Sequence, residues 1–429
     1  MLSIIKVSGR LWQQMKHQLM YWLRRSEKYT KVDMVYLASG NFWLIIGRVI
    51  SIGGGFFLTL ALGNLLDPVN FGTYKYILSV ASIIGAISLT GLTISALKEV
   101  SQGNQNLIPG LFQVGVLWSL PGSLIALLIA AYYFLNGNTV IGLSLLIIAL
   151  VNPLLNTLSL SKSIFIGKKD FKTGALSNIP KTIFTIGPLL ITLYFTSNVV
   201  IILAVYFLSN VITSWVLYLF VLYKYQISRD NTGLKQASTY GKHMTVISSL
   251  QTILNQVDQL LLWHFTGPTQ LAVYTFAQAP VRELRNFSDN FFPLIFPKFA
   301  IKKIETLKQI MPTRMWQMFG LSGFMAISYF FLAPFFFNLF LPQYTDSIFL
   351  SQIMALSLLA QSKGLIDIAI VTHAKTKLRY YAVLFSQFFK LITMLILIPT
   401  YGIMGAVIAS VATEFFSAFI FILIFRKIK

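Results

Sequence analysis

The sequence contains no cysteine, few histidines and few charged residues. With 0 cysteines in 429 residues, it has no disulfide bond, thiolate nucleophile or cysteine-based metal site. The 4 histidines lie far apart in the chain, so neither a metal site nor a cofactor is expected. Charged residues make up 11% of the chain, against about 25% in soluble proteins. Together with 56% hydrophobic residues, this deficit predicts an integral membrane protein.

The hydrophobic residues lie in long, continuous runs. The alternation of apolar and polar residues that marks a β-barrel is missing, and runs of about 20 residues suit helices that cross a bilayer. We therefore predict an all-α integral membrane protein. Its expected transmembrane helices number about twelve, at 42–63, 72–97, 109–135, 139–166, 174–196, 198–223, 243–265, 269–297, 313–340, 346–372, 379–399 and 402–425.

The basic residues gather on one side of this predicted topology. Of 34 Lys and Arg residues, 26 lie in the two tails or in the connections that follow every second segment. The other connections are short and contain no Lys or Arg. The positive-inside rule places the basic side, and therefore both termini, in the cytoplasm. Most of the net charge of +21 thus reflects topology, and no nucleic-acid partner is expected.

The longest basic connection falls midway along the chain and suggests two halves. Residues 1–33 are basic, with apolar residues at helical spacing, which indicates an amphipathic helix on the membrane surface. We predict a cytoplasmic tail at 1–38, a six-helix lobe at 39–223, a cytoplasmic interlobe loop at 224–242, a second six-helix lobe at 243–425, and a tail at 426–429.

A short internal repeat supports this division. Pro68, Phe71, Gly72 and Tyr74 follow the first segment in the pattern Pro-x-x-Phe-Gly-x-Tyr, and Pro268-x-x-Leu-Ala-x-Tyr follows the seventh segment 200 residues later. Repeats at the same point of each half are typical of transporters whose halves rock about a site at the membrane midplane. The sequence therefore predicts two pseudo-symmetric lobes around a central cavity.

The eighth segment carries polar residues on one face of a helix. Gln278, Arg282, Arg285 and Asp289 fall at i, i+4, i+7 and i+11. An arginine at mid-membrane costs about 2.5–3.5 kcal/mol, so it faces protein or a water-filled cavity. We interpret Arg282 and Arg285 as one wall of a substrate-binding cavity. The alternative is a structural network in which Asp289 or Glu283 neutralises the arginines.

Three further polar residues lie within the first and seventh predicted segments. Asn255 belongs to a polar stripe on the seventh segment, and Asp258 lies beside that stripe. Asp258 is either a site of ion coupling or, as we favour, a counter-ion. Arg48 in the first segment either lines the cavity or pairs with Asp258 or Glu283. No metal ligand or catalytic residue is assigned among these positions.

Four other charges inside the segments are expected to be structural. Lys363 and Asp367 are four residues apart and are predicted to pair within one helix. Lys390 and Glu414 are predicted to pair across the last two helices.

Several stretches resemble one family of membrane proteins. The turn Leu66-Asp67-Pro68-Val69-Asn70-Phe71-Gly72-Thr73-Tyr74, the helix end Leu97–Val100, the segment Asn255–Leu261 and the stretch Pro399–Ala406 occur in the order and spacing typical of that family. The chain resembles the polysaccharide-repeat (O-antigen, Wzx-type) flippases of the multidrug/oligosaccharidyl-lipid/polysaccharide exporter superfamily.

The resemblance implies a flippase of the bacterial inner membrane and no enzymatic activity. It implies a polyprenyl-pyrophosphate-linked oligosaccharide repeat unit as substrate, moved across the membrane by alternating access for O-antigen or other surface polysaccharide synthesis. Membrane lipid is an expected partner, and a polysaccharide polymerase and ligase are candidate partners. Arginines at mid-membrane suit this substrate, because guanidinium groups bind pyrophosphate in a fork.

Three alternative functions are compatible with a polytopic membrane protein. A peptidoglycan-precursor flippase of the same superfamily resembles a fourteen-helix protein, whereas twelve segments are counted here. A drug or cation exporter needs acidic residues in its cavity, where arginines dominate in this sequence. A polytopic polysaccharide polymerase or glycosyltransferase needs a sizeable outer loop with arginines or paired carboxylates. The predicted outer loops offer only Asp67 and Asp346, far apart.

Overall fold

The computed structural model describes residues 34–88, 90–289, 295, 299, 302–373 and 376–427. Side chains at 34–49, 247, 287–289, 376 and 377 lie outside this description. The amphipathic helix expected over 1–33 also lies outside the described residues.

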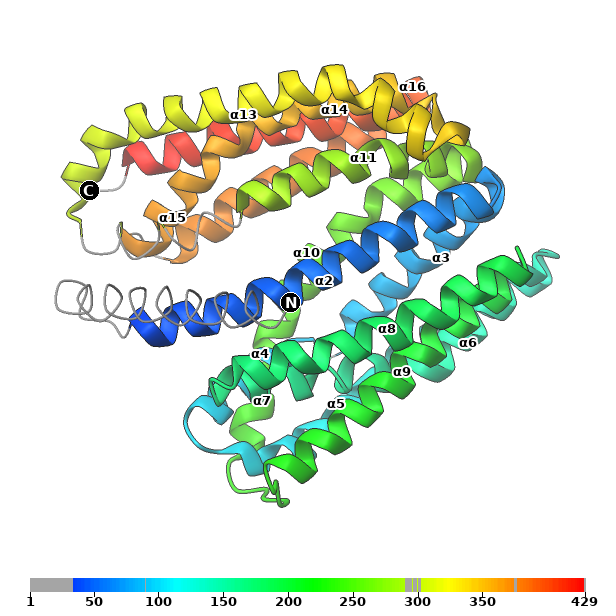
Figure 1. Cartoon of the computed structure of the whole chain (residues 1–429), viewed down its shortest axis with the longest axis vertical. Coiled ribbons are helices and arrows are strands. Elements are labelled where there is room, and N and C mark those ends of the chain that lie inside the picture. The colour runs from blue at the N-terminus through cyan, green and yellow to red at the C-terminus, as the bar shows by residue number, and fades with distance from the viewer. Residues whose placement is uncertain are drawn as a thin grey trace, which may run out of the picture.

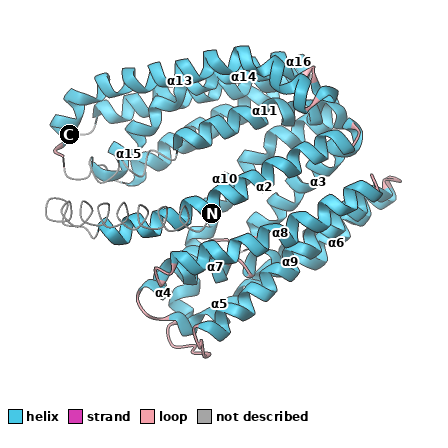
Figure 2. Ribbon diagram, in the orientation of Figure 1, coloured by secondary structure: helices cyan, strands magenta, loops and turns pink. Residues whose placement is uncertain are grey.

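Every regular element in the described part of the chain is a helix (Figure 2). The first half contains α2 (Met34–Leu65), α3 (Pro68–Ile87), α4 (Leu92–Ser101), α5 (Ile108–Leu135), α6 (Thr139–Thr157), α7 (Leu160–Gly167), α8 (Phe171–Phe195) and α9 (Val199–Lys224). The second half contains α10 (Leu234–Thr266), α11 (Pro268–Asp289), α13 (Ile304–Phe340), α14 (Ser347–Ala355), η3 (Leu356–Ser362), α15 (Lys363–His373) and α16 (Thr376–Lys427). The all-α prediction is confirmed.

The described helices that are long and apolar enough to span a membrane are fewer than the twelve expected segments. Among the described residues, 7 helices are long and apolar enough to cross a membrane, and up to 8 if the bent pair of α3 and α4 counts as one span. Helices α10 and α11 are absent from that set because polar residues interrupt them. These are the helices on which the sequence predicted a cavity wall.

Helix α16 contains two of the predicted segments. The helical conformation is interrupted at Gly402, whose φ of 56° and ψ of −133° lie outside the helical region. The rings of Phe389 and Phe416 stack with centroids 4.1 Å apart, so the two arms of α16 lie side by side. A Cβ at Gly405 would lie 1.9 Å from the Leu397 carbonyl oxygen, which requires glycine at this close turn. The helix is therefore a hairpin with arms close to the predicted 379–399 and 402–425.

The helices form two groups that meet at one end and diverge at the other (Figure 1). The groups diverge on the side where α2 begins and the described chain ends. One buried apolar cluster joins α4, α5, α7, α9 and the start of α10, and another joins α13, α15 and α16. The largest buried cluster contains residues of both halves and connects the groups where they meet. This is the two-lobed architecture that the sequence predicts.

Helix α10 begins earlier than the segment expected at 243 and packs against the first half. The Ser95 hydroxyl donates to the Ala237 carbonyl oxygen at 2.6 Å, and the Gly91 amide donates to Thr245 Oγ1 at 2.9 Å. Apolar Leu234 and Ala237, three residues apart, extend the helix into the predicted interlobe loop. The division of the chain at 224–242 stays a prediction.

The two copies of the internal repeat touch each other where the lobes meet. Pro68 and Pro268 each stand at the start of a helix, where a missing amide hydrogen costs nothing. A Cβ at Gly72 would lie 1.9 Å from the Pro268 carbonyl oxygen, so only glycine permits this approach. The rings of Phe71 and Phe276 stack at 4.4 Å beside the contact.

A polar cluster at the opposite end ties α8 to α9. Asp170 precedes α8 and accepts hydrogen bonds from the Thr173 amide at 3.1 Å, Lys224 Nζ at 2.8 Å and the Tyr225 hydroxyl at 2.7 Å. Burial by itself would raise the pKa of Asp170, but these hydrogen bonds outweigh it and hold the pKa well below its ordinary value.

We expect this cluster to stabilise the protein in a pH-dependent way. A carboxyl whose pKa is lower in the folded state stabilises the fold above its unfolded pKa, and that stabilisation is lost as the pH falls toward the folded pKa. The melting temperature of Asp170→Asn should therefore lie below that of the wild-type protein, by a difference that is constant around neutral pH. This difference should narrow below the ordinary aspartate value of 3.8. Thermal unfolding of both proteins between pH 3 and 7 measures this difference in melting temperature. A difference that does not change with pH would contradict the lowered pKa of Asp170.

Candidate functional site

A polar cavity of about 350 Å³ lies within the second half of the chain. Four elements of that half line it: α10, α11, the junction of α14 with η3, and both arms of α16. The lining residues are Asn255, Gln256, Asp258, Gln259, Gln278, Val281, Arg282, Arg285, Met354, Ser357, Gln387, Lys390, Ser410, Val411, Thr413 and Glu414. The first half reaches this wall through α3, where the Ser79 hydroxyl donates to Gln259 Oε1 at 2.5 Å.

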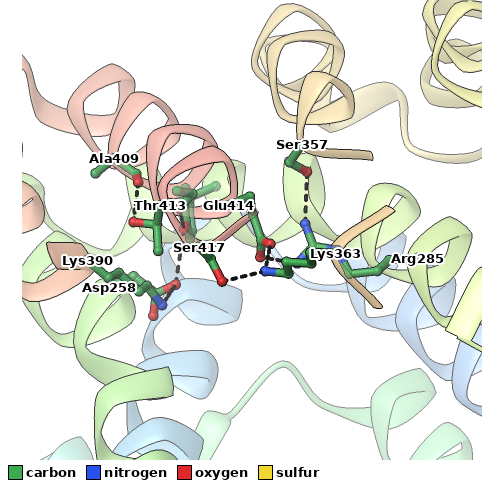
Figure 3. A network of polar contacts seen from close by, with 11 residues as sticks. Asp258, Arg285, Ser357, Lys363, Lys390, Ala409, Thr413, Glu414 and Ser417 are labelled. Carbon is green, nitrogen blue, oxygen red and sulfur yellow. Dashed lines mark hydrogen bonds and ion pairs between the residues drawn. The ribbon is translucent and has the colours of Figure 1, made fainter. Parts of the chain in front are cut away.

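Glu414 is the centre of one network in the wall (Figure 3). Arg285 Nη1 donates to one carboxylate oxygen and Lys363 Nζ to the other, each at 2.5 Å. Arg285 Nη2 also donates to the Ser357 hydroxyl at 2.9 Å, and Lys363 Nζ to the Ser417 hydroxyl at 3.1 Å. Two cations from different helices thus share one carboxylate. The buried Nε of Arg285 has no hydrogen-bond partner among the described residues.

Asp258 is the centre of a second network, which lies deeper. The residue is 2% exposed. Its Oδ2 lies 3.5 Å from Lys390 Nζ and accepts a hydrogen bond from the Tyr274 hydroxyl at 3.1 Å. The Tyr274 hydroxyl also lies 3.0 Å from the Ser410 hydroxyl. A buried carboxylate is stable only when it is paired and hydrogen-bonded, and this one is both. Asp258 is therefore a counter-ion to Lys390 in this structure.

Arg282 differs from the other cavity cations because it is open to solvent. Its side chain is 55% exposed, and its nearest carboxylate is that of the neighbouring Glu283, 3.8 Å from Nε. An exposed ion pair of this kind contributes little to the stability of the fold. The guanidinium of Arg282 is thus free to turn toward a ligand in the cavity, whereas Arg285 is held by Glu414.

The cavity has an excess of positive charge. Arg282, Arg285 and Lys390 line it, and Lys363 reaches the same network from behind the wall. In the described lining, these four cations face two carboxylates. Asp258 is paired with Lys390, and Glu414 is paired with both Arg285 and Lys363. Arg285 and Lys363 together carry one positive charge more than Glu414, whereas Arg282 has the Glu283 carboxylate 3.8 Å away.

Both ion pairs predicted for the structural charges are wrong. Lys390 pairs with Asp258, and Glu414 pairs with Arg285 and Lys363. Lys363 opens α15 directly after the 3-10 turn η3, and its side chain crosses to Glu414 on α16.

Asp367 is therefore left to another partner, although it lies four residues from Lys363. It accepts two hydrogen bonds from Arg379, at 2.7 Å and 3.0 Å. This fork satisfies both carboxylate oxygens more fully than one lysine within the helix would.

The structure brings together five of the seven residues that the sequence singled out. Asn255, Asp258, Gln278, Arg282 and Arg285 all line the cavity. The side chains of Arg48 in α2 and of Asp289 at the end of α11 lie outside the described residues. Any pairing of Arg285 with Asp289, or of Arg48 with Glu283, stays a prediction.

Sequence reasoning missed the part of the wall that α16 and η3 supply. Gln387, Ser410, Thr413 and Ser357 line the cavity, and Lys390 and Glu414 join them. A signal was present in the second arm of α16, since Ser410, Thr413 and Glu414 lie at i, i+3 and i+4 in an apolar helix. No group of three or more His, Asp or Glu side chains that could hold a metal occurs in the described part of the chain.

Comparison with known proteins identifies the family and the fold. The model of the family described as "Polysaccharide biosynthesis protein" matches residues 37–300. No curated protein matches the chain significantly.

Solved structures of transporters share the fold at low sequence identity. A multidrug resistance MATE family transporter of the MOP superfamily in its inward-facing conformation matches with 13% identity and a TM-score of 0.62, covering 89% of this chain and 97% of the other. The same kind of transporter in an outward-facing conformation matches with 15% identity and a TM-score of 0.58, covering 90% and 94%. A MOP superfamily transporter from Pyrococcus furiosus, whose binding pocket has reversed polarity, matches with 13% identity and a TM-score of 0.56, covering 90% and 94%.

The likeness to these structures extends over nearly the whole chain and shows a two-lobed transporter fold. The family match covers more than half of the chain. The chain therefore belongs to the polysaccharide biosynthesis protein family and has the fold of MOP superfamily transporters.

Proposed function

We propose that this protein is a flippase that moves a polyprenyl-pyrophosphate-linked oligosaccharide repeat unit across the bacterial inner membrane by alternating access. The observation that carries the proposal is the cationic wall of the cavity, where the Arg282 side chain is 55% exposed and Arg285 shares one carboxylate with Lys363. The family is one of polysaccharide biosynthesis, and its fold is that of a transporter, so a lipid-linked saccharide is the substrate class that fits both.

The chemistry of the wall suits a pyrophosphate. Arg282 and Arg285 are separated by about 4.5 Å along the helix axis, from a rise of about 1.5 Å per residue. Two guanidinium groups at that spacing reach one pyrophosphate, and each can donate in a fork. Polar side chains around them, including Asn255, Gln278 and Gln387, offer hydrogen bonds to sugar hydroxyls.

Glu414 gives the wall a means of releasing its ligand. In this structure it accepts from Arg285 and Lys363, so it occupies the cations that an anionic substrate needs. A pyrophosphate would compete with Glu414 for Arg285, and Glu414 would recapture the arginine when the substrate leaves. This competition would allow the headgroup to bind in the cavity and then to leave it.

A drug or cation exporter is the main alternative, because transporters of that kind share the fold. A cationic drug needs an uncompensated carboxylate in the cavity. Both carboxylates of the described lining, Asp258 and Glu414, are already paired with cations. The charge of the cavity therefore favours an anionic substrate over a cationic drug.

The packing of the lobes supports a rocking motion. The repeats touch at Gly72 and Pro268, and the lobes diverge at the opposite end, where the basic connections lie (Figure 1). With that end in the cytoplasm, the structure corresponds to a state open toward the cytoplasm, in which a headgroup made there enters the cavity. Breaking the contact of the repeats would open the other side.

A translocation assay tests the function. Purified full-length protein in vesicles receives a polyprenyl-pyrophosphate-linked oligosaccharide with a fluorescent sugar label, and a membrane-impermeant quencher reports its appearance in the other leaflet. We expect fast translocation of this lipid and none of a fluorescent cationic drug under an imposed ion gradient. Transport of the drug without transport of the lipid would contradict the proposal and favour an exporter.

Cysteine labelling tests the proposed orientation, because the natural chain has 0 cysteines. Single cysteines at Asp67, Gly137, Ser197, Gln343 or Thr400 should react with an impermeant maleimide in intact cells. Cysteines at Lys235 or Lys302 should react only after the cells are opened. The reverse pattern would refute the orientation.

A further inference from the structure

A second cavity lies on the outside of the second lobe, apart from the polar site. It measures about 610 Å³ and is enclosed by α13, α15 and the end of α16. Its walls are mainly apolar, with Met315, Trp316 and Phe319 on one side and Ile366, Ile422 and Phe425 on the other. None of its lining residues also lines the polar cavity. It is therefore a separate groove, here called the α13–α16 groove.

The groove is open to the surroundings of the protein along one wall. Trp316 is 72% exposed and Phe319 is 40% exposed, and both belong to the face of α13 that lines the groove. In a chain of membrane-spanning helices, apolar side chains exposed in this way lie against lipid tails. An occupant of the groove thus enters from the bilayer.

Two cations mark one end of the groove. Lys308 lies in the second turn of α13, and Arg426 is the second-last residue of α16. Both stand at helix ends, and both line the groove. From Lys308 to Phe319 the helix rises about 16 Å, which is close to half of the roughly 30 Å thickness of the hydrocarbon core. The groove therefore combines a cationic mouth with an apolar wall one leaflet deep.

We infer that the α13–α16 groove binds an anionic diacyl phospholipid, with its phosphate between Lys308 and Arg426 and an acyl chain along Trp316 and Phe319. Charge complementarity selects the anionic headgroup, because two cations at a membrane surface attract acidic lipids. The apolar wall selects a lipid over a free phosphate ion. The lipid would also contact Ser362 and Ile366, which flank Lys363 of the polar network, and so stabilise the part of the lobe that holds Glu414.

The test measures lipid binding to purified full-length protein in detergent. Phosphatidylglycerol is titrated against phosphatidylcholine, with native mass spectrometry for bound lipid and thermal unfolding for stabilisation, since a ligand that binds the folded state raises its melting temperature. We expect phosphatidylglycerol to bind and stabilise in preference to phosphatidylcholine. Lys308→Ala/Arg426→Ala should weaken phosphatidylglycerol binding about thirtyfold, as expected for two lost surface charges.

A matched control keeps this test specific. Lys303→Ala/Lys427→Ala removes two exposed basic residues of the same two helix ends that do not line the groove. This variant should bind phosphatidylglycerol like wild type. If Lys308→Ala/Arg426→Ala, the groove variant, does not fold, Met315→Trp provides a second test. It keeps both cations but fills the space along the apolar wall, so the protein should stay folded and lose the bound lipid.

Three results would overturn the inference. The first is equal binding of the two phospholipids by the wild-type protein. The second is equal loss of binding in the groove variant and the control, which would indicate a general surface charge effect. The third is a groove that prefers a polyprenyl phosphate to phosphatidylglycerol, which would assign it to a substrate tail.

Discussion

Replacing Arg282 and Arg285 together by alanine is expected to slow translocation of the lipid-linked oligosaccharide at least about a hundredfold, at a normal level of folded protein. Each guanidinium would make charge-assisted hydrogen bonds to the pyrophosphate, worth about 1.5–3 kcal/mol apiece, and about 1.4 kcal/mol corresponds to a factor of ten. Lysine at both positions should restore part of the rate, because it keeps the charge but loses the fork.

The contacts of the two arginines suggest that this double variant will fold. Arg282 is exposed, and Glu414 keeps Lys363 as a partner when Arg285 is removed. A purely structural role predicts a different outcome, namely a low level of folded protein that recovers when Glu414→Gln is added. Arg314→Ala is a suitable control, since Arg314 is exposed and bonds to Gln317 outside the cavity. A well-folded double variant that flips the lipid at the wild-type rate would refute the role of the arginine face.

The Asp258 network gives the largest effect expected on stability. Lys390→Ala should leave the Asp258 carboxylate buried without its cation, and Asp258→Ala should leave a buried ammonium group. Breaking a buried pair by removing one partner costs about 3–5 kcal/mol. We expect both single variants to yield little folded protein in size-exclusion chromatography of detergent extracts. Asp258→Asn with Lys390→Met should recover much of the loss, because neither charge remains.

A more exposed ion pair provides the comparison for this effect. Asp367 and Arg379 bond in a fork, but their side chains are 29% and 45% exposed. Asp367→Asn should therefore change stability by about 1 kcal/mol or less. If the Asp258 variants behave like Asp367→Asn, or if the double replacement is no better than the singles, Asp258 and Lys390 do not act as a buried pair.

Much of the fold was predictable because membrane helices are specified locally. Continuous apolar runs mark the helices, and Pro68 and Pro268 mark the same helix start in each half. The polar face of α11 was predictable for the same reason, since Gln278, Arg282 and Arg285 follow the helical period and no lipid-facing helix carries such a stripe. These features depend on residues close together in the chain.

The partners of the charges were not predictable because they depend on how neighbouring helices are rotated. Lys390 and Glu414 lie on adjacent arms of one hairpin, yet each turns to another helix. The 3-10 turn η3 sets the direction of Lys363, and nothing in its sequence marks a change from the α-helical period. Pairing across helices is a property of tertiary packing, so spacing in the sequence does not identify it.

Photocrosslinking from the wall of the polar cavity tests the central claim most directly. A benzophenone amino acid placed at Gln278, which lines the cavity, should crosslink the polyprenyl-pyrophosphate-linked oligosaccharide in vesicles. The crosslink should be lost in the Arg282→Ala/Arg285→Ala background. The same probe at Phe324, which is 70% exposed on the lipid side of α13, should capture bulk phospholipid instead. Capture of the oligosaccharide lipid at Phe324 but not at Gln278 would contradict the claim that the substrate passes through the arginine-lined cavity.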